Sequence, residues 1–69
     1  MSEASRTVEG IVRAQLPSGL YEVDVAAHRI TAHIGSGLER NFVRLLVGDR
    51  VVVELTSRDL NRGRIVRKA

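Results

Sequence analysis

Residues 20–34 read LYEVDVAAHRITAHI, and this stretch decides the fold. Apolar side chains recur at every second position in residues 20–25 and again in residues 28–34, with charged or polar side chains between them. A two-residue period is the pattern of a strand that has one face in a core and one in water. Only a short connection separates the two segments, so we predict a hairpin. The side chains expected to face inward are Tyr21, Val23, Val25, Ile30, Ala32 and Ile34.

The same alternation continues on both sides of this hairpin. Residues 8–16 predict a preceding strand that bends at Gly10, and Pro17-Ser18-Gly19 has the composition of a turn. Residues 50–55 predict a fourth strand, and residues 62–68 predict a fifth, whose inward face the sequence leaves open. The inward residues expected on the first and fourth strands are Val8, Val12, Ala14, Leu16, Val51, Val53 and Leu55.

A short helix is expected between the third and fourth strands, because Leu38, Phe42 and Leu45 recur at helical spacing. An open five-stranded sheet would expose two edges in so small a protein, and closure into a barrel removes them. The position of the helix favours an all-β, five-stranded OB-fold barrel over an SH3-like barrel. We expect residues 1–6 to be a disordered N-terminus and residues 7–69 to form one OB-fold domain.

The charge distribution indicates a polyanionic partner. The chain of 69 residues has a net charge of +3, and residues 58–69 contain five basic side chains against one acidic side chain. Ten of the eleven basic residues are arginines, whose planar guanidinium binds phosphate in a bidentate manner. Clustered basic residues on a small domain are typical of a nucleic-acid-binding protein. A solvated, solubilising tail is the alternative interpretation.

No pattern in the sequence indicates catalysis, a metal site or a cofactor. The chain has no cysteine, and His28 and His33 would lie on opposite faces of one strand, where they cannot share a metal ion. Tyr21 and Phe42 are the only aromatic residues, too few for a platform that stacks single-stranded bases. We therefore expect a protein without enzymatic activity that binds folded RNA through arginine, backbone and shape.

The sequence also indicates where the protein acts. No apolar run approaches the ~20 residues that cross a bilayer, and the polar start of the chain lacks the apolar core of a signal peptide. The lack of cysteine fits a reducing compartment. We expect a cytoplasmic protein that makes no membrane contact and, because its outward faces are charged, a monomer.

A series of short motifs carries a family resemblance. The motifs are Glu9-Gly10-Ile11-Val12, Leu16-Pro17, Thr31-Ala32-His33-Ile34, Leu46-Val47-Gly48-Asp49-Arg50-Val51, Val53-Glu54-Leu55-Thr56, Asp59-Leu60 and Arg62-Gly63-Arg64-Ile65-Val66. In this order and spacing, over residues 8–67, the chain resembles bacterial translation initiation factor one, of the S1-like OB-fold family. The resemblance implies a non-catalytic factor that binds the aminoacyl-tRNA site of the small ribosomal subunit. It also implies contacts with 16S-type ribosomal RNA and a neighbouring ribosomal protein, and action together with the other initiation factors.

Eight residues are candidate RNA contacts. They are His33, Leu38, Arg40, Asn41, Arg44, Arg62, Arg64 and Arg67. Arg40 and Arg44 are four residues apart and would share one helical face, although a solvated pair without a role is the alternative. In the resembling family the apolar residue of this loop lies against an RNA groove, which suggests Leu38, whereas packing against Phe42 is the alternative.

The fifth strand supplies the other candidates. By strict alternation Arg62 and Arg64 share one side of the strand and Arg67 points to the opposite side. Phosphate contact is the functional interpretation, and a frayed basic terminus is the alternative. Two other functions stay open: a general RNA-binding OB-fold module such as an RNA chaperone, and a structural or protein-interaction barrel that does not bind nucleic acid.

Overall fold

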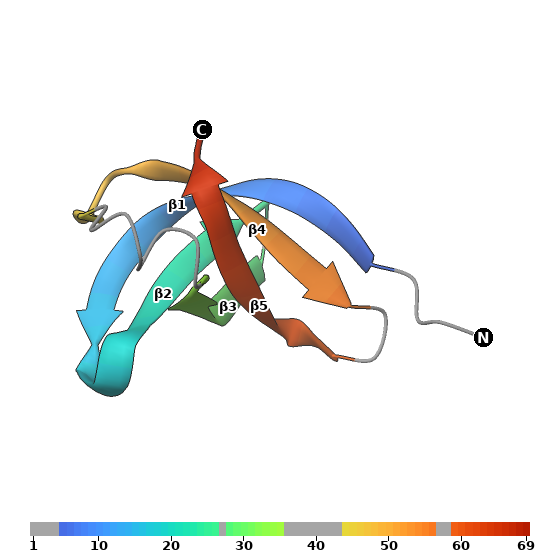
Figure 1. Cartoon of the computed structure of the whole chain (residues 1–69), viewed down its shortest axis with the longest axis horizontal. Helices are drawn as coiled ribbons and strands as arrows, with labels where there is room; N and C mark the ends of the chain where they lie inside the picture. The colour runs from blue at the N-terminus through green and yellow to red at the C-terminus, as the bar shows by residue number, and fades with distance from the viewer. Residues whose placement is uncertain (1–4, 27, 36–43, 57–58) are drawn as a thin grey trace.

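The protein is a closed barrel of five strands (Figure 1). The computed structural model describes residues 5–26, 28–35, 44–56 and 59–69. Around the barrel the strands follow the order β1-β2-β3-β5-β4. The strands are β1 (Ser5–Leu16), β2 (Leu20–Val25), β3 (His28–Ile34), β4 (Arg50–Thr56) and β5 (Asp59–Lys68). The expected all-β, five-stranded barrel is therefore confirmed.

Two strands have the bounds that the alternating pattern predicts, and three are longer. β2 and β3 match residues 20–25 and 28–34. β1 begins at Ser5, so Ser5 and Arg6, expected to be disordered, instead pair with Thr56 and Leu55 of β4. Backbone hydrogen bonds to a neighbouring strand hold this polar segment in the sheet.

The expected helix falls mainly on residues 36–43, which lie outside the described residues. Residues 44–49, which follow them, contain no helix. Within the described ranges the single helical turn is η1 (Pro17–Gly19), at the position where a turn was expected, with Ser18 in the left-handed region at φ 65°. No helix among the described residues is long and apolar enough to span a membrane.

Closure of the barrel depends on one parallel pairing. β3 runs parallel to β5, with Thr31 opposite Arg62 and His33 opposite Arg64, while the other four neighbouring pairs are antiparallel. β1 is long enough to pair with β4 through its first half and with β2 through its second half. Gly10 lies at this bend, where an added Cβ would be 2.6 Å from Val23 Cγ1. Only glycine fits this close approach.

The core fills the inside of the barrel with small and branched side chains. Val12, Val23, Val51, Val53 and Ile65 are fully buried. Among the side chains predicted to face inward, Val8, Val25 and Ile34 are partly buried and pack against this cluster. The further members of the core are Tyr21, Ile30, Ala32, Leu45 and Leu55.

A β-bulge in β1 changes the face of the residues that follow it. Val12 pairs with the buried Val23, but the next pair joins Ala14 to Glu22, so Arg13 is the extra residue. Ala14 and Leu16 therefore share the outer face of Glu22 and Leu20, and the prediction that they point inward with Val12 is wrong. A bulge adds one residue to one strand, and every later side chain changes face.

A tight turn precedes β4 and is held to β1. The Leu46 N–H donates to Asp49 Oδ2 at 2.9 Å, and the Asp49 N–H donates back to the Leu46 carbonyl at 3.0 Å. Gly48, at φ 100°, donates to the Val12 carbonyl at 2.8 Å. Lys68 Nζ lies 3.4 Å from Asp49 Oδ2 and so ties the end of β5 to the same turn.

Candidate nucleic-acid interface

The outer face of β5 carries two exposed arginines next to each other. Arg62 and Arg64 flank Gly63, whose partner on β3 is the buried Ala32. Their own partners on β3 are Thr31 and His33, which alternate with buried residues and face outward. The register therefore settles the facing that the sequence left open, and brings His33, Arg62 and Arg64 to one surface. β5 crosses in front of the other strands in Figure 1.

Arg67 lies on this same outer face, which corrects the prediction that it points the other way. In the β4–β5 ladder Ile65 pairs with Val53, but the next pair joins Arg67 to Val52, so Val66 is the extra residue of a bulge. Val52 lies between the core residues Val51 and Val53 on β4, so its side chain points to the outer face. The bulge shifts the inward–outward alternation of side chains by one residue, so a prediction from strict alternation fails for Arg67.

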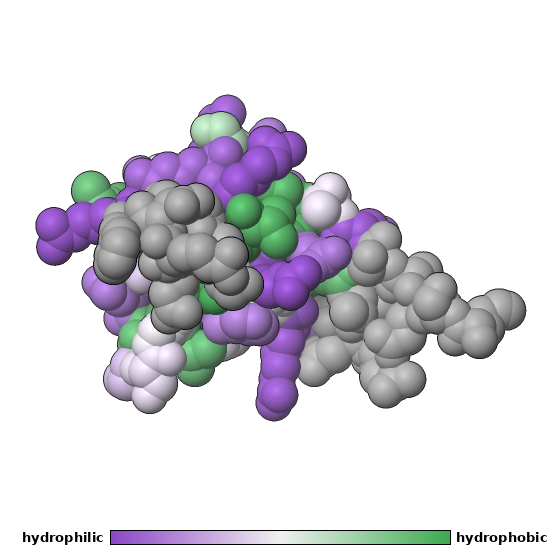
Figure 2. Space-filling view, in the orientation of Figure 1, coloured by the Kyte–Doolittle hydropathy of each residue, from purple (hydrophilic) through white to green (hydrophobic). Residues whose placement is uncertain are grey.

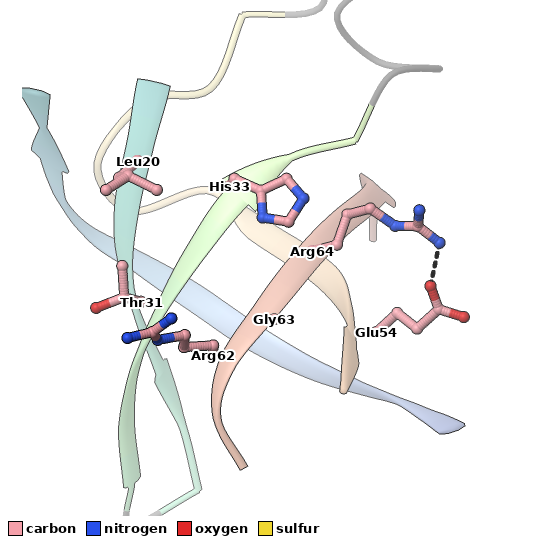
Figure 3. A pocket seen from close by; sticks show the side chains of 7 residues that line it. All are labelled: Leu20, Thr31, His33, Glu54, Arg62, Gly63 and Arg64. Atoms are coloured by element: carbon pink, nitrogen blue, oxygen red, sulfur yellow. Dashed lines mark hydrogen bonds and ion pairs between the residues drawn. The ribbon is translucent and has the colours of Figure 1, made fainter. Parts of the chain in front are cut away.

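An open groove of about 870 Å³ lies over the outer face of the paired strands β3 and β5 (Figure 3), and we call it the β3–β5 groove. In Figure 3 the Arg62 side chain extends towards Thr31, its partner on β3, while Arg64 extends in the other direction towards Glu54. The groove thus has a guanidinium on each side of a floor that includes Gly63. Its lining residues are Leu20, Thr31, His33, Glu54, Arg62, Gly63 and Arg64.

Arg64 forms an ion pair with Glu54 across the β4–β5 ladder. The two residues are direct partners in the ladder, and Arg64 Nη2 donates to Glu54 Oε1. Both side chains stay in contact with water, 50% exposed for Arg64 and 30% for Glu54. The groove therefore contains one carboxylate among its cationic side chains.

Carboxylates of β2 neutralise the arginines of β1 and of the start of β3. Asp24 accepts from Arg29 Nε at 3.1 Å and lies 3.0 Å from Arg13 Nε, and Glu22 lies 3.8 Å from Arg29 Nη1. The hydrogen bond to Asp24, followed by the charges of Asp24 and Glu22, raises the pKa of the Arg29 guanidinium. The part of the outer face that holds Arg13, Glu22, Asp24 and Arg29 thus presents a balanced network rather than a basic patch.

Of the other candidate RNA contacts, one lies within the described residues and three do not. Arg44 is exposed just before the Leu46–Asp49 turn and does not line the groove. Leu38, Arg40 and Asn41 lie outside the described residues. In the space-filling view of Figure 2, hydrophilic side chains dominate the visible described surface, with small apolar areas between them.

The sequence did not single out Thr31, Glu54 or Leu20 as part of this surface. Thr31 and Glu54 were expected to face outward, and Leu20 was expected at the start of a strand. Nothing in the sequence, however, specifies which strands become neighbours. Only the β3–β5 and β4–β5 registers bring Thr31 and Glu54 to the two arginines. No three His, Cys, Asp or Glu side chains gather as metal ligands would in the ranges that the structure describes.

The comparisons with known proteins agree with this architecture. A search of protein-family models finds none that matches the chain. Among solved structures, the chain is similar to the solution structure of translation initiation factor one from the Wolbachia endosymbiont strain TRS of Brugia malayi. The two share 35% sequence identity at a TM-score of 0.77, over 94% of this chain and 78% of that chain. A relative this similar over nearly the full length shows the family, and the chain belongs to the family of bacterial translation initiation factor one.

Proposed function

We propose that this protein is a non-catalytic translation initiation factor that binds the small ribosomal subunit through its ribosomal RNA. The observation that carries the proposal is the alignment of Arg62, Arg64 and Arg67 on the outer face of β5. Three guanidinium groups along one strand can follow a phosphate backbone, and the β3–β5 groove adds shape to charge.

The site on the subunit is the aminoacyl-tRNA site, by analogy with the family. There the protein contacts 16S-type ribosomal RNA and a neighbouring ribosomal protein, and it acts together with the other initiation factors in the cytoplasm. His33 lies next to Arg64 and adds a donor to this surface. Leu38, Arg40, Asn41 and Arg44, from the sequence between β3 and β4, extend the RNA contact. The protein acts as a monomer.

Co-sedimentation with isolated small ribosomal subunits tests the proposal. We expect the protein to sediment with the subunits at stoichiometric amounts and to stay bound when excess unrelated RNA is added. Binding that the competitor RNA removes would favour a general RNA-binding module or RNA chaperone. Absence of binding at low salt would exclude the proposed function. Large subunits serve as the control for non-specific adsorption to ribosomal RNA.

A further inference from the structure

Glu54 occupies an unusual place among the described carboxylates. Glu22 and Asp24 pair with Arg13 and Arg29 on the β1–β2–β3 face. Asp49 pairs with Lys68 at the turn before β4. Among the described acidic side chains, Glu54 alone lines the groove that also holds Arg62 and Arg64.

The barrel does not need the Glu54–Arg64 pair for stability. Both partners keep substantial contact with water, at 30% and 50% exposure, and exposed ion pairs contribute little to folding. The two strands are already joined by their backbone ladder on both sides of the pair. The main consequence of the pair therefore concerns what else the guanidinium can bind.

An RNA phosphate that approaches Arg64 also comes close to the carboxylate of Glu54. A guanidinium has five N–H donors, so the single bond to Glu54 leaves donors for phosphate. The carboxylate nevertheless lies in hydrogen-bond contact with that guanidinium, well within the screening length of about 8 Å at physiological salt, and repels the phosphate. Arg67, opposite Val52, forms no ion pair with a described residue and carries no such opposing charge.

We infer that Glu54 limits the affinity of the β3–β5 groove for RNA phosphate by partly neutralising Arg64 within the binding face. The inference rests on the proposed function, because it concerns the same surface. It adds a residue that acts against binding, so that this face holds RNA more weakly than its arginines alone would.

Glu54→Gln separates charge from geometry. The glutamine amide oxygen can still accept from Arg64, so the side chain stays in place while the negative charge is removed. We expect Glu54→Gln to tighten binding to a short RNA duplex of arbitrary sequence by roughly two- to fivefold at low salt. The dependence of affinity on salt should also become steeper, because Arg64 can then displace a full counterion.

Asp24→Asn is the matched control. Asp24 is 34% exposed and pairs with two arginines, so this variant makes the same change in net charge at a similar depth, but at a residue that does not line the groove. We expect Asp24→Asn to change affinity for the duplex by less than about twofold, since added charge outside the contact is largely screened. Thermal unfolding of both variants checks that the barrel stays folded.

Three outcomes would overturn the inference. Unchanged or weaker duplex binding by Glu54→Gln would show that the carboxylate does not oppose phosphate. Weaker binding by Glu54→Ala together with unchanged binding by Glu54→Gln would show that Glu54 orients Arg64 instead. Equal gains in duplex affinity for Glu54→Gln and Asp24→Asn would show that the effect comes from net charge alone. Failure of the wild-type protein to bind small subunits would instead contradict the proposed function, and the duplex measurements would still decide the role of Glu54.

Discussion

Arg67 lies opposite Val52 in the β4–β5 ladder, although the adjacent pair joins Ile65 to Val53. The one-residue bulge at Val66 therefore turns Arg67 from the inner face, which it would share with Ile65, to the outer face of Arg62 and Arg64. Val52 is only 5% exposed on that outer face, and the aliphatic stem of Arg67 begins beside it. An arginine stem can cover apolar surface while its charged head stays in water.

Arg67→Ala should weaken binding to small ribosomal subunits. Because the bulge places Arg67 on the binding face, its loss should lower affinity on the order of fivefold and make the salt slope shallower by about one. Arg13→Ala is the control, since Arg13 pairs with Asp24 at 3.0 Å and does not line the groove. Equal losses in the two variants, measured by co-sedimentation at one salt concentration, would mean that the binding face is assigned wrongly.

Arg64→Ala should reduce subunit binding without unfolding the barrel. Its exposed pair with Glu54 contributes about 0–1 kcal/mol to stability, which predicts a small change in melting temperature. Affinity should fall roughly two- to fivefold, less than a full phosphate contact would give, because Glu54 already offsets part of the charge. A sharp fall in melting temperature with intact affinity would show that Arg64 is structural.

The alternating pattern predicted the strands well but failed where the barrel must bend. β2 and β3 follow a strict two-residue period, and both their bounds and their inward residues agree with it. The bulges at Arg13 and Val66 have no signature in the sequence, because each is set by how a long strand meets two neighbours around a closed barrel. The faces assigned to Ala14, Leu16 and Arg67, which lie beyond a bulge, were therefore wrong.

The binding surface was predictable only in part. Charge clustering and the family resemblance singled out Arg62, Arg64 and His33, which the β3–β5 register does bring together. Glu54 was missed because its position opposite Arg64 depends on the pairing of β4 with β5. Leu38, Arg40 and Asn41 remain predictions.

Gly63→Ala should destabilise the barrel. An added Cβ would lie 2.5 Å from Val53 Cγ1 and 3.0 Å from the Glu54 carbonyl oxygen, so core and backbone must both shift. We expect a loss of about 1–3 kcal/mol in the free energy of unfolding. In a domain of this size that loss corresponds to a fall of roughly 4–8 °C in melting temperature per kcal/mol.

Gly19→Ala provides the comparison for Gly63. Gly19 has nothing within 4 Å of an added Cβ and differs from alanine only through its backbone, at φ +74°. Gly19→Ala should lower the free energy of unfolding by about 1 kcal/mol or less. Denaturant unfolding of both variants should rank Gly63→Ala as the more destabilised, and the reverse order would contradict close packing at Gly63.

Asp49 should make the stability of the barrel depend on pH. The Leu46 N–H and, to a lesser extent, Lys68 lower the pKa of the Asp49 carboxyl in the folded state. The carboxylate therefore stabilises the barrel above its unfolded pKa of about 3.9, and this contribution is lost as pH falls through the lower folded value. Asp49→Asn should be less stable than wild type at neutral pH, and the difference should shrink as the solution is acidified.

Lys68→Ala tests whether the Leu46 N–H lowers the pKa of Asp49 more than Lys68 does. Because the bond from Leu46 is the larger cause, removal of the lysine should cost less stability at neutral pH than removal of the carboxylate. Urea unfolding of the three proteins at several pH values gives the comparison. A difference between wild type and Asp49→Asn that stays constant across the acidic range would exclude the role of the charged carboxylate.

Binding to small ribosomal subunits should weaken steeply with salt. Arg62, Arg64 and Arg67 share one described face, and the sequence adds Arg40 and Arg44 between β3 and β4. If about four to six basic side chains each neutralise one phosphate, the logarithm of affinity should fall with the logarithm of salt concentration at a slope of roughly −3 to −5. The double variant Arg62→Ala, Arg67→Ala should reduce the magnitude of that slope by about two, because each contact contributes one released counterion. Titrations at four salt concentrations measure both slopes. A flat dependence for the wild-type protein would remove the electrostatic basis of RNA binding and favour a barrel that recognises protein alone.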